Sequence, residues 1–262
     1  MRRTLGSGLP ARPPLALPAM PVEGALSPRL PLTKNGVPYE FYFTRMAYSG
    51  VGWRGYASWS IDYPKADRQF MTGIQRLINR LDAYAHENPI LLTDPQLHRY
   101  PFLYAVEVGF MSLSEEEVVA LRRYLDAGGF LVIDDFWGAR ELRNLVAEMR
   151  RVLPDRSIVD VPQDHPVFHC FYDVNKIVQV PNLQKGQEMA LGIPGATTWE
   201  KGGQVPKVKG VFDDSGRLMV AINWNSDLGD AWEWAENALY PLEYSTYAYQ
   251  MGVNYIVYAM TH

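Results

Sequence analysis

Two short apolar segments on either side of a well-marked helix constrain the fold more than any other feature of the sequence. The segments are residues 101–106 (PFLYAV) and 130–133 (FLVI). Their continuous apolar character is typical of strands that are buried on both faces of a parallel sheet. Between them, Ser114 and Glu117 have the spacing of a capping box, and the glycine pair at 128–129 predicts the helix end. The sequence therefore predicts a strand–helix–strand unit with parallel strands.

The same alternation of strands and helices extends over the rest of the chain. Apolar residues recur at helical spacing from Phe70 to Tyr84, with Pro64 in the first turn. Further predicted strands cover residues 39–44, 89–92, 208–212 and 217–223, and further predicted helices cover 142–149 and 243–260. We therefore expect an α/β fold with a doubly wound, mostly parallel sheet between flanking helices. The strands of the second half should complete this sheet as an antiparallel or mixed edge.

The first 38 residues differ in composition from the rest of the chain. They contain 8 of the 19 prolines and carry a net positive charge. Proline at this density is incompatible with helix interiors and central strands, so we expect a flexible leader over 1–38 and a single α/β domain over 39–262. Arg2 and Arg3 also fit the start of an export signal, although prolines interrupt the apolar stretch that such a signal needs.

Composition argues against several classes of protein. The net charge of −4 argues against a nucleic-acid partner. No apolar run approaches about 18 residues, so no membrane span is expected. A single cysteine, Cys170, excludes an intramolecular disulfide and a multi-cysteine zinc site. Residues 50–55 match G-x-G-x-x-G but are not followed at once by a helix, so we do not interpret them as a nucleotide site. No metal and no cofactor is predicted.

Polar and aromatic residues follow several of the predicted strands. Ligands of open α/β sheets bind outside the carboxyl ends of the strands, so these residues should lie together at one edge. The residues predicted to bind a ligand there are Trp53, Arg54, Trp59, Asp62, Glu107, Asp134, Asp135, Trp137, Asn223, Asn225 and Asp227.

The adjacent pair Asp134 and Asp135 is the most distinctive part of this set. A carboxylate here can act as a general base, bind a metal ion or hold a sugar hydroxyl. Alternatively, one of the two caps the helix that starts near Gly138. Because adjacent side chains of an extended segment point in opposite directions, the two should have different roles. Glu107 is the third candidate catalytic residue, with a salt bridge to an arginine as its structural alternative.

His165 and His169 are also candidate ligand-binding residues. Their spacing of four would place them on one face of a helix, where Asp164 could orient one ring. Two histidines without acidic partners do not make a zinc site. The alternative that we favour is a short helix capped by Asp164, with both histidines packed as polar residues.

Five segments together resemble a known but uncharacterised family. They are SIDYPKADRQF, YPFLYAVEVG, LSEEEVVALRRYLDAGGFLVIDDFWG, EMRRVLPDR and DHPVFHCFYD. The chain is similar over residues 39–262 to a bacterial family known as domain of unknown function 4159. The resemblance implies a class I glutamine amidotransferase-like fold, with a flavodoxin-like sheet, and it implies no established reaction. Members often carry export signals, which slightly favours an exported or periplasmic location over a cytoplasmic one.

The resemblance to amidotransferases does not extend to their nucleophile. Those enzymes need a cysteine on a tight turn between a strand and a helix. Here residues 101–106 are followed by Glu107, Val108 and Gly109, so we do not expect a glutamine amidotransferase.

Three hypotheses for function follow from the sequence. The first is a non-catalytic module that binds a carbohydrate or peptide-like ligand at the predicted edge, with tryptophans that stack on the ligand. The second is a hydrolase at the same edge that works through Glu107, Asp134 and Asp135, with or without a divalent ion. The third is a scaffold subunit that docks a protein partner through the aromatic residues at 53–59 and 232–234.

Overall fold

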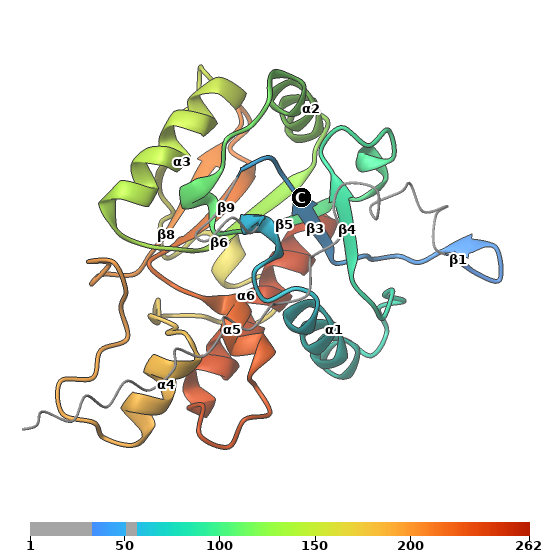
Figure 1. Ribbon diagram of the computed structural model, residues 1–262. Helices are drawn as coiled ribbons and strands as arrows, with labels where there is room; N and C mark the ends of the chain where they lie inside the picture. The colour runs from blue at the N-terminus through green and yellow to red at the C-terminus, as the bar shows by residue number, and fades with distance from the viewer. Residues whose placement is uncertain (1–32, 51–56) are drawn as a thin grey trace, which may run out of the picture.

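A seven-stranded sheet forms the centre of the molecule. The computed structural model describes residues 33–50 and 57–262 (Figure 1). The strand order is β4-β3-β5-β6-β9-β8-β7. The strands are β3 (Thr44–Ala47), β4 (Asn88–Leu91), β5 (Phe102–Val106), β6 (Phe130–Phe136), β7 (Val159–Asp160), β8 (Lys207–Phe212) and β9 (Leu218–Trp224). β4, β3, β5, β6 and β9 are parallel, whereas β8 runs antiparallel to β9 and to β7. The mostly parallel α/β sheet with a mixed edge is therefore as predicted.

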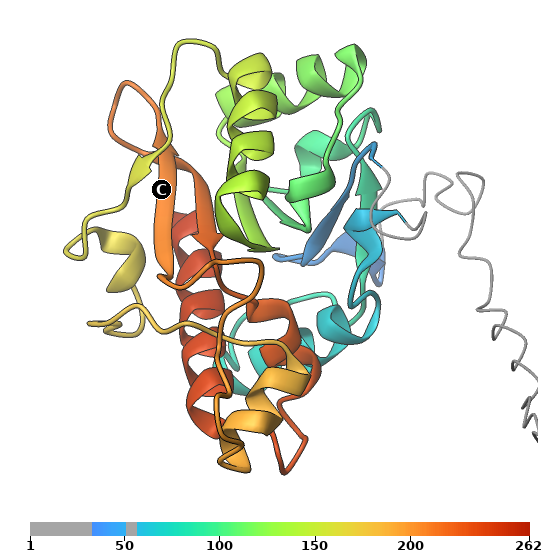
Figure 2. The same ribbon diagram turned by 60° about the vertical axis from the view of Figure 1, so that its left-hand side comes forward.

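Helices cover both faces of this sheet, as two views of the ribbon show (Figures 1 and 2). α1, α5 and α6 pack on one face, α2 and α3 pack on the other, and α4 lies beyond the end of the sheet, beside α5 (Figure 1). The helices are α1 (Lys65–Leu77), α2 (Glu115–Asp126), α3 (Gly138–Val152), α4 (Leu183–Ala190), α5 (Leu228–Glu233) and α6 (Leu242–Thr261). Within the described ranges, no helix has the length and apolar character needed to cross a membrane.

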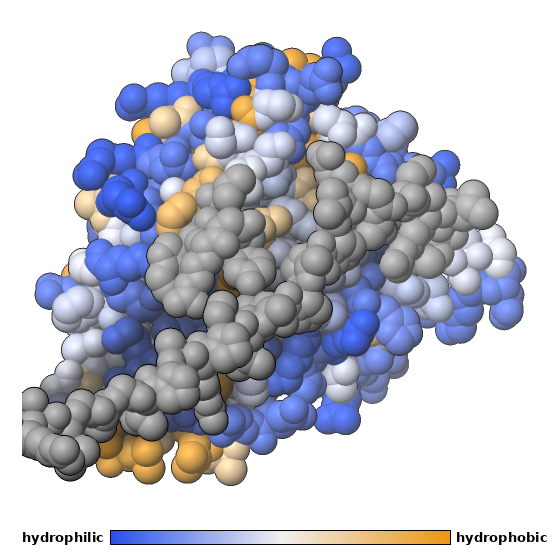
Figure 3. Space-filling model, in the orientation of Figure 1, coloured by the Kyte–Doolittle hydropathy of each residue, from blue (hydrophilic) through white to orange (hydrophobic). Residues whose placement is uncertain are grey.

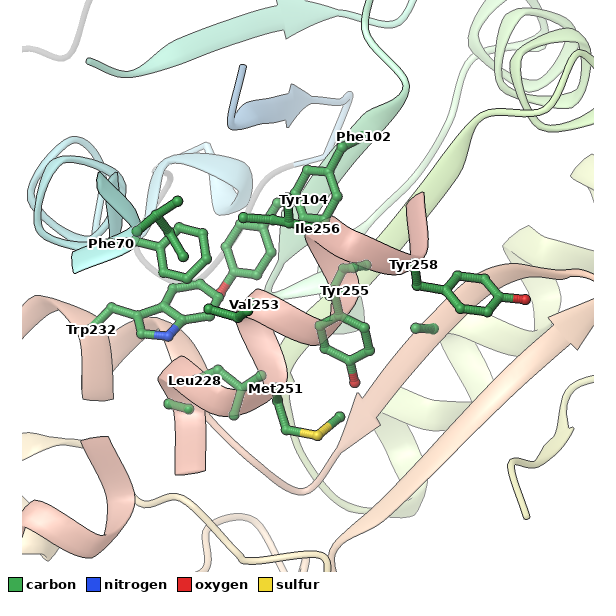
Figure 4. Close-up of a cluster of buried hydrophobic side chains, with 14 of the residues drawn as sticks. Phe70, Phe102, Tyr104, Leu228, Trp232, Met251, Val253, Tyr255, Ile256 and Tyr258 are labelled. Atoms are coloured by element: carbon green, nitrogen blue, oxygen red, sulfur yellow. The ribbon is translucent and has the colours of Figure 1, made fainter. Parts of the chain in front are cut away.

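Each face of the sheet has its own hydrophobic core, and β5 contributes side chains to both. Phe102 and Tyr104 point toward α1, α5 and α6, whereas Leu103 points toward α2 and α3. Figure 4 shows Tyr104 beside Trp232 of α5, with Phe70 of α1 against the same indole. The ring centroids are 5.2 Å apart for Tyr104 and Trp232 and 4.2 Å apart for Phe70 and Trp232. These aromatic contacts hold α1 and α5 against the sheet, directly below the carboxyl ends of its strands.

The first strand of the sheet lies later in the chain than the sequence predicts. The expected strand covered residues 39–44, but β3 is Thr44–Ala47, and Phe41 forms only an isolated bridge with Ala83. Arg45 accounts for the error, because a charged residue was taken to end the strand. In the structure Arg45 is fully buried within β3 and is paired with Asp67 of α1. Burial of arginine is unusual unless the charge is paired, and the sequence alone does not reveal the pairing.

The predicted capping box at the start of α2 is present. Ser114 Oγ accepts a hydrogen bond from the Glu117 amide at 3.2 Å, and Glu117 accepts one from the Ser114 amide at 2.8 Å. We expect Ser114→Ala to lower the free energy of unfolding by about 1 kcal/mol, because one amide of the first turn loses its acceptor. Urea denaturation measures this difference. An unchanged midpoint for Ser114→Ala would show that the box adds nothing to the stability of α2.

A small hairpin and a group of exposed apolar side chains lie at the surface of the molecule. Within the segment expected to be a leader, β1 (Thr33–Lys34) and β2 (Val37–Pro38) form a small antiparallel hairpin. Large apolar side chains are exposed from the end of α4 to residue 193 and from residue 239 to the start of α6, at the lower end of the view in Figure 3. They are Met189, Leu191, Ile193, Leu239 and Leu242.

Candidate functional site: an acidic cluster at the carboxyl edge of the sheet

Carboxylates from different strand ends meet at one edge of the sheet. Asp62 lies in the connection after β3, Asp135 lies near the end of β6, and Asp227 follows β9. One carboxylate oxygen from each of the three lies within 4.8 Å of the other two. In the sheet, β4 lies on one side of β3 and β5 lies on the other side. The direction in which the chain adds strands therefore reverses between β3 and β5, which makes this a topological switch point. This is the position at which open α/β sheets bind ligands.

Asp62 is held in place through the backbone that precedes it. Arg45 donates hydrogen bonds to the carbonyls of Trp59 and Ile61 at 3.2 and 3.1 Å. Asp62 itself has φ of 60°, and its Oδ2 is buried without a hydrogen-bond partner. A Cβ atom at Gly229 would lie 3.1 Å from this oxygen, so the glycine permits a close approach between α5 and Asp62. An unpartnered buried carboxylate oxygen is costly, which marks Asp62 as a functional candidate.

Asp134 and Asp135 lie inside β6, which extends further than predicted, and they point in different directions. Tyr104 donates its hydroxyl to Asp134 Oδ2 at 2.7 Å, and the Gly229 amide donates to the same oxygen at 3.0 Å. Asp135 has φ of 45° at an irregularity in the pairing of β6 with β9, and its Oδ1 accepts from the Trp137 indole at 3.0 Å. A bulge of this kind re-aims a side chain, here toward Asp62 and Asp227.

Neither aspartate caps α3. The Trp137 amide donates to Glu141 at 2.7 Å, and the Gly138 amide donates to Asn225 Oδ1 at 2.8 Å. The capping alternative for Asp134 and Asp135 is therefore wrong, because side chains from α3 itself and from the end of β9 satisfy these amides. Both aspartates remain available for another role.

Asp227 belongs both to the cluster and to the start of α5. Its Oδ1 accepts a hydrogen bond from the Asp230 amide at 2.8 Å, as expected of a helix cap. Asp230 and Glu233 of α5 form a second acidic group with Asp62, again with carboxylate oxygens within 4.8 Å. The sequence did not indicate these two residues, because they lie in a short helix that was not predicted.

Burial and mutual repulsion make these carboxyl groups unusually weak acids. Burial raises the pKa of Asp62, Asp135 and Asp227 well above the ordinary value, and the negative charge of neighbouring acids raises each further. Burial also raises the pKa of Asp134 to about 7, although hydrogen bonds from Tyr104 and backbone amides act against it. Such perturbed groups at a sheet edge are typical of functional sites.

Glu107 lies beside the cluster, directly after β5. Its backbone is left-handed, with φ of 52°. Lys201 lies 3.6 Å from Glu107 Oε2 and 2.9 Å from Glu141 Oε1, so the salt bridge expected with an arginine is made by a lysine. Burial raises the pKa of Glu107 to about 7, although the charge of Lys201 acts against it. Lys201 was missed because it lies in a long connection between α4 and β8 without a recognisable motif.

Several other predicted residues also lie at this edge, mostly in structural roles. Asn225 caps α3, and Asn223 donates to the Ile133 carbonyl and accepts from Tyr255. Trp137 is only 1% exposed, so its ring has no open face for stacking on a ligand. Trp59 is half-buried against Tyr63, with ring centroids 5.7 Å apart. Trp53 and Arg54 lie outside the described residues.

The two histidines lie elsewhere. His165 precedes a single 3-10 turn, Pro166–Phe168, and packs against Phe212 and Tyr258. Phe212 pairs with Leu218 at the start of β9, so His165 is at the end of the sheet opposite the acidic cluster. His169 contacts Asp173 and the Gln163 carbonyl. The helical face is therefore not formed, and the prolines at 162 and 166 account for the short turn. The expected cap by Asp164 is also wrong, because His165 Nδ1 accepts the hydrogen bond of the Val167 amide at 3.2 Å.

Comparison with known proteins agrees with the sequence resemblance. No protein with a curated description matches the chain. A family described as Domain of unknown function (DUF4159) matches residues 43–260, which include β3 to β9, helices α1 to α5, all of α6 except its last residue, and every acidic residue of the cluster. The chain therefore belongs to the DUF4159 family.

Proposed function

We propose that this domain is a ligand-binding module whose site is the acidic cluster of Asp62, Asp135 and Asp227. The observation that carries the proposal is the placement of one oxygen from each residue within 4.8 Å of the others, at the carboxyl ends of the parallel strands. Concentrating buried negative charge is unfavourable for the fold alone, so its presence favours a ligand that compensates it. Carboxylates accept hydrogen bonds, and a small ligand rich in hydroxyl or amino groups, such as a carbohydrate or peptide-like compound, supplies the donors.

The fold supports this placement. Taken in chain order, the five parallel strands have the arrangement 2-1-3-4-5, which is the flavodoxin-like order. This agrees with the class I glutamine amidotransferase-like fold that the resemblance implies. Glutaminase chemistry is not part of the proposal. Glu107 stands where such an enzyme would need its cysteine, and Cys170 instead donates to the Asn254 carbonyl at 3.2 Å.

A ligand screen tests the proposed site. We expect one compound class among sugars, amino compounds and cell-wall fragments to raise the melting temperature of the full chain. A ligand at about 100 times its Kd stabilises a protein by about 2.7 kcal/mol, which corresponds to roughly 5–11 °C at this size. Asp135→Asn should abolish the shift. Asp160→Asn is the matched control, because Asp160 is an exposed acid paired with Lys207 and Lys209. A shift that persists in Asp135→Asn would contradict the assignment.

A hydrolase at the same edge is the second candidate, and the raised pKa of the half-buried Glu107 beside the cluster favours it. A carboxyl group with a pKa of about 7 can donate a proton near neutral pH. Glu107 would serve as the acid and Asp135 as the base, whereas Asp134 lies fully buried beneath them. Turnover of a glycan or ester that is lost in Glu107→Gln, with ligand binding retained, would favour this reading over simple binding.

One of the two aromatic surfaces named in the docking hypothesis is not formed. Trp232 is buried and Trp234 lies under the ammonium group of Lys65, so residues 232–234 do not form an exposed aromatic patch. Residues 53–56 of the other predicted contact segment lie outside the described residues. The exposed apolar side chains near α4 and on the α5–α6 connection offer a further surface for a protein partner (Figure 3).

A further inference from the structure

We propose that Asp62, Asp135 and Asp227 together bind one divalent cation of the hard, oxygen-seeking class, and that the ligand of the proposed function coordinates this ion. The inference rests on the proposed function and names what the acidic cluster uses to hold a ligand. Mg²⁺, Mn²⁺ and Ca²⁺ all prefer carboxylate oxygens. The spacing of the three carboxylates within 4.8 Å allows one oxygen from each to reach the same ion.

Two buried carboxylate oxygens support the inference independently of the spacing, one on Asp62 in the cluster and one on the neighbouring Asp134. Asp62 Oδ2 is buried and accepts no hydrogen bond from any described residue. Asp134 is fully buried, and its Oδ1 is also without a partner. The lack of a side chain at Gly229 leaves room beside these oxygens, because a Cβ there would lie 3.1 Å from Asp62 Oδ2 and 3.5 Å from Asp227 Oδ1. Buried carboxylates are normally paired with a donor or a cation, so these oxygens favour a bound positive charge.

The neighbouring cations of the protein have other partners. Arg45 is paired with Asp67, Lys201 with Glu141 and Glu107, and Lys65 with Glu233. Among the described residues, none of the three proposed ligands forms an ion pair with a lysine or arginine. No lysine or arginine is thus committed to the three carboxylates, and a cation from solution can compete with protons for them.

The second acidic group, Asp62 with Asp230 and Glu233, is a poorer site for an ion. Asp230 accepts hydrogen bonds at both oxygens, from the Leu183 amide at 2.7 Å and from the Trp234 indole at 3.2 Å. Glu233 lies 4.0 Å from the ammonium group of Lys65. The carboxylates of Asp230 and Glu233 are thus already engaged by other groups of the protein. Glu233 provides a matched control that lies beside Asp62 but outside the proposed ligand set.

Three carboxylate oxygens leave part of the coordination sphere to other ligands. Mg²⁺ takes six oxygens and Ca²⁺ takes six to eight, and water or a hydroxyl-bearing ligand supplies those that the protein does not. A bound ion would therefore serve two purposes: it would neutralise the buried charge, and it would offer positions for ligand oxygens. A carbohydrate or a carboxylate-bearing peptide fragment fits these positions.

Cation titration of the full chain tests the inference. Protein is treated with EDTA, dialysed and titrated with Mn²⁺, Mg²⁺ and Ca²⁺ in separate calorimetry experiments. We expect one ion per chain for at least one of them, at least tenfold weaker binding by Asp62→Asn, and binding by Glu233→Gln within twofold of wild type. Asp62→Asn removes no side-chain hydrogen bond found within residues 33–50 and 57–262, and circular dichroism verifies that the variant is folded.

Three outcomes would overturn the inference. They are no binding of any of the three ions up to 1 mM, unchanged binding by Asp62→Asn, and loss of binding in Glu233→Gln equal to that in Asp62→Asn. The ligand screen, run once with EDTA and once with the bound ion, separates this inference from the proposed function. A ligand shift of equal size in EDTA would overturn the ion and leave the ligand site. One bound ion without any organic ligand would support the ion and contradict the ligand.

Discussion

Asp67→Asn is expected to lower the free energy of unfolding by about 3–5 kcal/mol, because it leaves the buried charge of Arg45 without its partner. Both side chains are fully buried. Arg45 Nε lies 2.9 and 3.1 Å from the two Asp67 oxygens, and Arg45 Nη2 also donates to Oδ1. Burial by itself lowers the pKa of Arg45, but the charge and hydrogen bonds of Asp67 more than offset this and raise it.

The next residue of the same helix supplies the control. Arg68 forms an ion pair with Glu87 at 2.6 Å, but the Arg68 side chain is 56% exposed. Exposed pairs of this kind contribute about 0–1 kcal/mol, so Glu87→Gln should change stability little. Urea denaturation of both variants at one pH makes the comparison. Similar losses for Asp67→Asn and Glu87→Gln would show that burial of the Arg45 pair has no special weight.

The same pair connects stability to the candidate site. Arg45 holds the carbonyls of Trp59 and Ile61, and therefore positions Asp62. Replacing both partners by apolar residues, as in Arg45→Met with Asp67→Leu, should recover part of the lost stability, since apolar pairs often replace buried ion pairs without loss. The double variant should nevertheless fail to bind the cation, because the segment that carries Asp62 loses its support.

The second large effect concerns pH. Asp134 should make the metal-free protein about 4 kcal/mol less stable at pH 8 than at pH 4, because its pKa is raised from 3.8 to about 7 by folding. Between these values the folded state holds a proton that the unfolded state has lost. The free energy of unfolding therefore falls as pH rises through this window. It levels off above pH 7, and the penalty is absent below pH 3.8.

Urea denaturation from pH 4 to pH 8 in the presence of EDTA measures this dependence. From pH 4 to pH 8, the free energy of unfolding of Asp134→Asn should fall by about 4 kcal/mol less than that of wild type. Asparagine carries no charge, and its amide oxygen can still accept the hydrogen bonds of Tyr104 and Gly229. Asp160→Asn is the control: Lys207 and Lys209 lower the pKa of Asp160, so its titration lies below the window. Parallel curves for wild type and Asp134→Asn would contradict the raised pKa.

Local patterns were sufficient for most of the elements and for the location of the candidate site. The capping box at Ser114 and the glycines at 128–129 mark α2 correctly, because helix ends depend on residues that are neighbours in sequence. The apolar segments that became β5 and β6 were recognisable for the same reason. Parallel strands bring their carboxyl ends to one edge, so the sequence alone predicts that Glu107, Asp134, Asp135 and Asp227 lie together.

What depends on contacts between distant segments was decided only by the tertiary structure. The sequence predicts that the first strand ends near Arg45, whereas in the structure Arg45 lies inside the strand because it pairs with Asp67, 22 residues later. Lys201 reaches Glu107 and Glu141 from a long connection, and Asp62 meets Asp227 because Gly229 allows α5 to approach. Burial of a charge is favourable only when its partner is present, and a single sequence shows which residues are charged but not which of them meet.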